Sequence, residues 1–234
     1  KRRKTVSVAK GYHGHTGLAL AAGDERFSRM FLSEGPPGEF VQVPWNDLDA
    51  MAAALSGDDV AAAVLETIPA TLGFPPPAPG YLARVKALCT QRGALYIADE
   101  VQTGLGRTGT LWAIEQHDVE PDILVTGKGL SGGLYPIAAT VLSGRVAGWL
   151  DEDGWGHVST FGGAEVGCRV AQRVLEITTR PATLANVKET AQHLGDGGLV
   201  VGDVAAHVRV AAGEVGQRPH PHPVLVATGE QRSA

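Results

Sequence analysis

The stretch Ala94-Leu95-Tyr96-Ile97-Ala98 is an uninterrupted apolar run that ends directly before two acids, Asp99-Glu100. The segment Asp122-Ile123-Leu124-Val125-Thr126 has the same character and ends at Gly127-Lys128. Strands without polar alternation are typical of a parallel sheet that is covered on both faces. The two segments therefore predict buried strands of one sheet, with Asp99 and Lys128 following their carboxyl ends.

The sequence around these segments alternates between strand and helix signals. Residues 61–66 form a further apolar strand, and a Pro-rich loop follows from Pro69 to Pro79. Four apolar residues then recur at helical spacing: Tyr81, Val85, Leu88 and Cys89. A strand over 136–143 and a long helix over 164–177 complete the pattern. Alternating strands and helices predict an α/β fold, a mostly parallel sheet flanked by helices.

Three charged side chains follow the predicted strands: Glu66, Asp99 and Lys128. In an open α/β sheet the ligand site lies outside the carboxyl ends of the strands, so these residues are expected on one rim. A carboxylate there can keep a pyridine nitrogen protonated, and a lysine made nucleophilic by desolvation forms Schiff bases. Together they suggest pyridoxal 5'-phosphate (PLP) as the cofactor.

Simpler interpretations of the same residues stay open at this level. A lysine at a strand end often extends its side chain to the solvent. Asp99-Glu100 also suits a plain strand terminus, or the metal-coordinating acids of a nucleotide hydrolase. A nucleotide hydrolase, however, needs a Gly-rich loop that ends in Gly-Lys-Ser/Thr, and Lys128 is followed by Gly129. That last interpretation is therefore the weakest.

The composition limits the class of protein. The chain has 234 residues, a formal net charge of −5, 44% hydrophobic and 19% charged residues, which is typical of a globular protein. Two cysteines, Cys89 and Cys168, are too few for a disulfide framework and favour a reducing compartment. We expect a soluble cytoplasmic protein with no membrane or nucleic-acid partner. We expect no metal either, because His13-Gly14-His15 lacks accompanying ligands.

Five ordered segments resemble the class III aminotransferases, the ornithine and acetylornithine aminotransferase group of fold-type I PLP enzymes. They are Tyr12-His13-Gly14, the run from Asp99 to Gly104, Gly106-Arg107-Thr108-Gly109, the run from Pro121 to Lys128, and the run from His157 to Gly163. They occur in the family's order. The resemblance implies the fold of a fold-type I large domain.

The resemblance also implies roles for individual residues. Lys128 would be the Schiff-base lysine, and afterwards the base that moves a proton between the substrate α-carbon and the cofactor. Asp99 would pair with the pyridine nitrogen. Gln102 would hydrogen-bond the phenolic oxygen of the cofactor, and Tyr12 would stack on its ring.

Three further residues join the predicted cofactor site through the same resemblance. Thr160 belongs to a loop that reaches the cofactor phosphate of the partner subunit, which implies a homodimer with a shared active site. Glu66 matches a strand-end glutamate that faces the active site. His13 lies within the matched Tyr12-His13-Gly14 segment and is counted among the cofactor-binding residues.

The resemblance has limits along the chain. Family members are nearly twice as long, so we expect the N-terminal segment with its phosphate-binding loop, and the C-terminal small domain, to be largely missing. Residues 1–190 are predicted to form a partial PLP-binding large domain. Residues 191–234 are predicted to form a divergent tail that is partly disordered.

The predicted activity is transfer of an amino group between an amino acid and a 2-oxo acid through Lys128. A PLP-dependent decarboxylase or aminomutase stays open, because the same residues prepare the α-carbon without choosing which bond breaks. A non-catalytic remnant of such an enzyme also stays open, because the phosphate-binding loop is expected to be missing.

Overall fold

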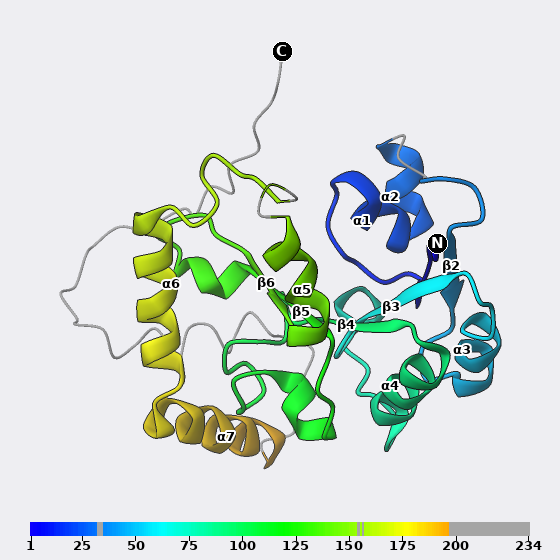
Figure 1. Cartoon of the computed structure of the whole chain (residues 1–234). Coiled ribbons are helices and arrows are strands. Elements are labelled where there is room, and N and C mark those ends of the chain that lie inside the picture. Colours follow the sequence, from blue (N-terminus) through cyan, green and yellow to red (C-terminus); the bar gives the residue numbers. More distant parts are fainter. Residues whose placement is uncertain (32–34, 154, 156, 197–234) are drawn as a thin grey trace. The chain divides into compact units, whose positions relative to one another are not determined.

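A computed structural model of the chain describes residues 1–31, 35–153, 155 and 157–196. Within this part, six strands form one sheet in the order β2-β1-β3-β4-β5-β6 (Figure 1). The strands are β1 (Lys4–Val8), β2 (Phe40–Val43), β3 (Val60–Glu66), β4 (Leu95–Asp99), β5 (Ile123–Thr126) and β6 (Ala139–Leu142). The first five are parallel to one another, and β6 is antiparallel to β5. The predicted mostly parallel sheet is confirmed.

Helices connect and cover the strands. They are α1 (Gly17–Ala22), α2 (Glu25–Met30), α3 (Leu48–Ala54), α4 (Tyr81–Arg92), α5 (Gly144–Glu152), α6 (Glu165–Thr178) and α7 (Pro181–Asp196). Three short 3-10 helices lie in the loops: η1 (Ala70–Leu72), η2 (Ala113–His117) and η3 (Lys128–Ser131). Figure 1 shows α1 and α2 on one side of β1–β3, and α3 and α4 on the other.

The helix predicted after Pro79-Gly80 is α4, and its carboxyl end has a local cause. Gly93 follows its last residue with φ of 66°, a left-handed conformation that glycine adopts without steric cost, and its N–H bonds back into the last turn. The predicted helix over 164–177 is α6. The predicted tail begins inside α7, whose last residue is Asp196, and its remaining residues lie outside the described ranges.

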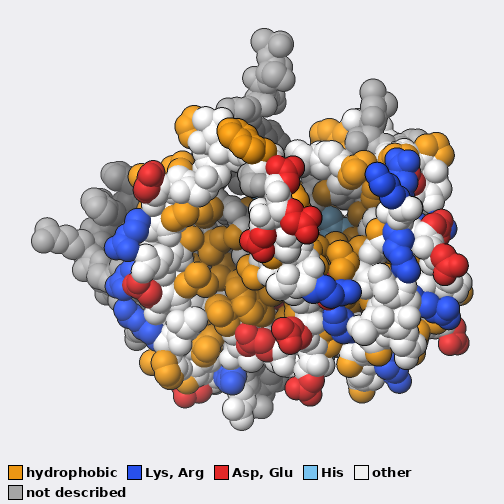
Figure 2. Space-filling view, viewed as in Figure 1, with side chains coloured by type: hydrophobic (Ala, Val, Ile, Leu, Met, Phe, Trp, Pro, Cys, Tyr) orange, Lys and Arg blue, Asp and Glu red, His pale blue; other side chains and the backbone are white. Residues whose placement is uncertain are grey.

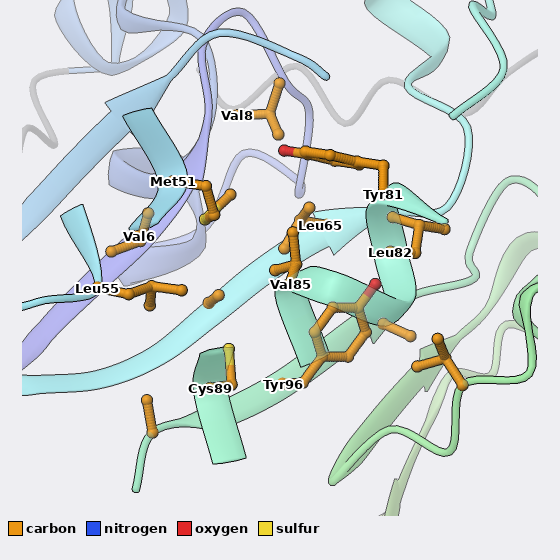
Figure 3. Packing of buried hydrophobic residues seen from close by; sticks show 14 of the residues in the cluster. Val6, Val8, Met51, Leu55, Leu65, Tyr81, Leu82, Val85, Cys89 and Tyr96 are labelled. Atoms are coloured by element: carbon orange, nitrogen blue, oxygen red, sulfur yellow. The ribbon is translucent and has the colours of Figure 1, made fainter. Parts of the chain in front are cut away.

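The main core lies between β1, β3 and β4 and the helices α3 and α4 (Figure 3). Its largest buried side chains include Leu65 of β3 and Tyr96 of β4, both fully shielded from solvent. From the helices come Met51, Leu55, Tyr81, Leu82, Val85 and Cys89. Burying each such side chain contributes roughly 1.5–3 kcal/mol, so this core holds the strand ends in a fixed register.

A second apolar region lies beside α6 and is open to solvent. Figure 2 shows hydrophobic side chains gathered between α5 and α6. A groove of about 580 Å³ is lined there by β5, β6 and α6, with Leu130, Ile137, Val141 and Leu175 among its side chains. None of the predicted site residues is among the described residues that line it.

Two further observations concern the chain as a whole. Cys89 is buried, Cys168 is exposed, and both are free thiols. Among the described residues, no helix combines the length and the apolar character that a membrane span needs.

A buried carboxylate anchors the amino end of β5. Asp122 accepts hydrogen bonds from Lys86 Nζ at 2.8 Å, Arg145 Nη2 at 2.7 Å and Tyr96 N at 2.8 Å. Burial opposes ionisation of this group, but the bonds from Lys86, Tyr96 N and Arg145 outweigh it and lower the pKa of Asp122 below its usual value. Asp122 therefore stabilises the fold in its ionised form, at the end of β5 opposite Lys128.

The lowered pKa of Asp122 gives a prediction about how the stability of the fold depends on pH. Asp122→Asn should lower the free energy of unfolding at neutral pH by about 1–3 kcal/mol, because an amide cannot replace the charge-assisted bonds. The difference from wild type should be constant above the unfolded pKa of about 3.9 and shrink as pH falls through the lower folded pKa. Urea unfolding of both proteins between pH 3 and 7 measures it. An equal difference at every pH would contradict the role of the charge.

Candidate active site

The strand register brings the predicted rim together. Glu66, the last residue of β3, pairs with Asp99, the last residue of β4. Asp99 in turn pairs with Val125 of β5, and Lys128 follows three residues later at the start of η3. The carboxyl ends of three adjacent parallel strands therefore carry Glu66, Asp99 and Lys128, as the order of the strands requires.

Asp99 is held on both carboxylate oxygens. His13 Nδ1 lies 2.8 Å from Asp99 Oδ2, and because a carboxylate oxygen accepts, Nδ1–H is the donor. Val101 N donates to Asp99 Oδ1 at 3.1 Å. The two side chains are 5% (His13) and 10% (Asp99) exposed, so little water competes for this pair. The other ring nitrogen, His13 Nε2, is buried and has no hydrogen-bond partner among the described residues.

Glu66 ties the loop after β1 to the loop after β3. Its Oε1 accepts from Tyr12 N at 2.9 Å, and its Oε2 accepts from Ala70 N at 3.1 Å. Burial raises the pKa of Glu66 and the charge of Asp99 adds to the rise, whereas the two backbone bonds and His13 oppose it. Glu66 therefore keeps its proton to a higher pH than an exposed glutamate does.

The loop that carries Tyr12 and His13 depends on a glycine. A Cβ on Gly11 would lie 2.9 Å from Val8 O, which real Cβ atoms do not tolerate. The half-buried Tyr12 ring then packs edge-on against His15 at 5.0 Å and Phe27 at 5.9 Å between ring centres. Edge-to-face contacts of this kind hold an aromatic ring in one orientation.

Lys128 has an exposed side chain and a strained backbone. Its φ is 40°, in the left-handed region, which costs a non-glycine residue roughly 1–2 kcal/mol. Within the described part of the chain, its amine makes no hydrogen bond and no ion pair. The amine is therefore accessible to an aldehyde, but it is not desolvated, which differs from the desolvated lysine expected from the sequence.

Gln102 and Thr160 lie outside the strand ends that carry Glu66 and Asp99. Gln102 is half-buried in the turn directly after β4, close in sequence to Asp99. Thr160 is exposed in the segment before α6 and makes no hydrogen bond with the other predicted site residues that the structure describes. The role of Thr160 in a partner subunit's site stays a prediction.

The two acids Asp99 and Glu100 do not act as a pair. Asp99 contacts His13, whereas Glu100 is 1% exposed and bonds to Thr67, Thr103 and the start of η2. Neighbouring residues at a strand end point to opposite faces, a rule that separates the two carboxylates already at the level of sequence. In the described part of the chain, no group of three or more His, Cys, Asp or Glu is placed to hold a metal ion.

The residues present fit PLP. Asp99 is a fixed, buried acceptor for a protonated ring nitrogen, and Lys128 is a free amine for an aldehyde. The orphaned His13 Nε2 adds a buried polar atom beside Asp99 whose hydrogen-bonding capacity is unused. This donor set matches the chemistry of the cofactor that the resemblance implies.

Comparison with known proteins identifies the family of this chain. The sequence matches the family described as aminotransferase class-III over residues 1–211. The chain belongs to the class III aminotransferases. The resemblance and the fold-type I architecture predicted from the sequence are thereby confirmed.

The similar proteins are longer than this class III chain. An uncharacterized aminotransferase from Archaeoglobus fulgidus is 51% identical over 195 residues, which are 83% of this chain and 45% of that protein. The structure of ornithine aminotransferase from Toxoplasma gondii ME49 is 35% identical, with a TM-score of 0.70, and the match covers 83% of this chain and 44% of the other. The structure of N-acetylornithine aminotransferase from Stenotrophomonas maltophilia K279a is 30% identical, with a TM-score of 0.66, and the match covers 91% of this chain and 46% of the other. This chain thus spans somewhat less than half of their length.

Proposed function

We propose that this chain carries the PLP site of an aminotransferase that moves an amino group between an amino acid and a 2-oxo acid. The observation that supports this most strongly is the buried Asp99–His13 pair, whose Asp99 ends β4, the strand adjacent to the one that leads to Lys128. Family membership supports the reaction type. The relatives' names add ornithine and N-acetylornithine as substrates of those proteins.

PLP, when bound, supplies an aldehyde that condenses with amines and a ring that takes up the electron pair released at the substrate α-carbon. Asp99, held in place by His13 and Val101 N, would accept a hydrogen bond from the ring nitrogen and keep that nitrogen protonated. Lys128 Nζ would hold the cofactor through its aldehyde, and the same amine would serve as the base for the substrate α-proton.

The remaining residues orient and enclose the cofactor. Gln102 would donate to the phenolic oxygen, and Tyr12, whose ring is oriented by His15 and Phe27, would stack on the cofactor ring. Glu66 holds the Tyr12 backbone, so it keeps this loop against the site.

Thr160 binds the cofactor phosphate of a partner subunit in this proposal, so that a homodimer shares two sites. Its exposed side chain, which is available for a second chain, supports this role. The two free thiols support a reducing compartment, and we place the protein in the cytoplasm.

Covalent trapping tests the proposal. The purified protein is incubated with PLP, reduced with borohydride, digested and mapped by mass spectrometry. We expect the pyridoxyl group on Lys128 at PLP concentrations that leave Lys10 unmodified. Lys10 is a suitable reference, because it is also exposed and also has a left-handed backbone, with φ of 63°.

Two results would contradict the proposal. One is modification spread over Lys10 and the other exposed lysines in proportion to their exposure. The other is the absence of any adduct on protein that circular dichroism shows to be folded.

A further inference from the structure

Glu100 is a buried carboxylate that the proposed mechanism does not use. It is 1% exposed and accepts four hydrogen bonds. Oε1 accepts from Thr67 Oγ1 at 2.5 Å and Ile114 N at 2.8 Å. Oε2 accepts from Thr103 Oγ1 at 2.8 Å and Ala113 N at 3.1 Å. Four donors on two oxygens leave this carboxylate fully satisfied.

The members of this network stand next to the proposed site residues in the sequence. Thr67 directly follows Glu66, Glu100 directly follows Asp99, and Thr103 directly follows Gln102. One carboxylate thus joins the end of β3, the end of β4 and the turn after β4, one residue beyond Glu66, Asp99 and Gln102. The N–H groups of Ala113 and Ile114 anchor the carboxylate to η2, 13 and 14 residues further along the chain.

We propose that Glu100 is a positioning residue of the cofactor site, which sets the relative placement of Glu66, Asp99 and Gln102. The inference rests on the proposed function. Its physical basis is that a bound ring must meet several groups at once. Displacement of such groups by about 1 Å can lower the reaction rate on the order of 100-fold. A network that links the three neighbouring backbones keeps these distances constant before the ligand arrives.

The geometry requires a carboxylate and not merely a polar side chain. The N–H groups of Ala113 and Ile114 can only donate, and they bond to different oxygens of Glu100. In Glu100→Gln, one of them would face an amide NH₂ in place of an acceptor. The strand end would then shift or lose a buried bond.

The test compares Glu100→Gln with Asp122→Asn. Asp122 is a matched control, because it is also a buried carboxylate with several donors, but it lies at the amino end of β5. We expect both variants to melt at a lower temperature. Only Glu100→Gln should raise the PLP dissociation constant, by about 10-fold or more. Asp122→Asn should stay within about twofold of wild type.

A second pair of variants keeps the carboxylate and changes one donor. Thr67→Val removes the hydroxyl that bonds Glu100, and Thr67→Ser retains it. We expect weaker PLP binding in Thr67→Val and near wild-type binding in Thr67→Ser. If Glu100→Gln fails to fold, the two Thr67 variants decide whether the Glu100 network positions the cofactor site.

A measurement without PLP separates this inference from the proposed function. The Val101 N–H donates to Asp99 and reports whether that carboxylate stays in place. Its amide hydrogen exchange should accelerate in Glu100→Gln and Thr67→Val, but not in Asp122→Asn or Thr67→Ser. Failure of the wild-type chain to trap PLP at Lys128 would count against the proposed function, while these exchange rates would still decide the role of Glu100. Equal exchange of the Val101 amide and equal PLP binding in Glu100→Gln and Asp122→Asn would overturn the proposed positioning role of Glu100.

Discussion

Lys128→Ala should reduce amino-group transfer by about 10²- to 10⁴-fold, the usual contribution of a positioned acid–base group, and should remove the covalent attachment of PLP altogether. The effect is large because Nζ both holds the cofactor and moves the α-proton in the proposed mechanism. In the described part of the chain, no other lysine lies at the carboxyl end of β3, β4 or β5 within the matched segments. Single-turnover spectroscopy of the PLP-loaded protein, mixed with a panel of amino acids, measures the rate.

Two matched variants separate chemistry from general damage. Lys10→Ala removes an exposed lysine whose backbone is also left-handed, and it should leave the rate unchanged. Lys128→Arg keeps the positive charge, but a guanidinium does not lose its proton, so this variant should be as inactive as Lys128→Ala. A Lys128→Ala protein that transfers amino groups at more than a tenth of the wild-type rate would contradict the assignment.

Asp99→Asn should lower the same rate by about 10²-fold or more, because a neutral amide no longer favours a protonated ring nitrogen. Its shape is nearly that of aspartate: the amide oxygen can accept from Val101 N, and the amide NH₂ can donate to His13 Nδ1 when that ring carries its proton on Nε2. Asp99→Ala should lose the rate and stability as well, since His13 Nδ1–H and Val101 N–H would then lack their acceptor. Each unsatisfied buried donor costs about 1–3 kcal/mol.

Comparison of the two Asp99 variants isolates the charge. Urea unfolding measures stability, and the single-turnover rate measures function. Asp99→Asn should differ from wild type mainly in the single-turnover rate. Asp122→Asn is again the control, with a loss of stability and an unchanged rate. A rate for Asp99→Asn within threefold of wild type would show that the charge of Asp99 does not serve the reaction.

The sequence predicted the central strands and the longer amphipathic helices well. The predicted strands 61–66 and 94–98 are β3 and β4 to within a residue, because their runs of apolar residues are buried on both faces. The strand over 136–143 is shorter, Ala139–Leu142, and runs antiparallel to β5. This direction depends on the path of the loop between η3 and β6, which hydrophobic periodicity does not report.

Other elements had no clear signal in the sequence. The edge strand β2 has four residues, and α1 and α2 have six each, too few for a periodic pattern to stand out. The strand β1 lies inside the sheet between β2 and β3, yet it follows a basic segment and was not predicted as a strand. Its burial comes from long-range pairing with Phe40–Val43 and Val60–Ala63, which neighbouring residues do not encode.

The sequence by itself determined that Glu66, Asp99 and Lys128 share one rim, since parallel strands joined by helices must end on the same side. Only the tertiary structure decided what each of them contacts. His13, 86 residues before Asp99, bonds its carboxylate, and Glu100 bonds Thr67 across two strands. The presence of a buried strand follows from local apolar patterning, whereas a hydrogen bond between distant residues exists only after the loops have closed and the core has fixed the register of the strands.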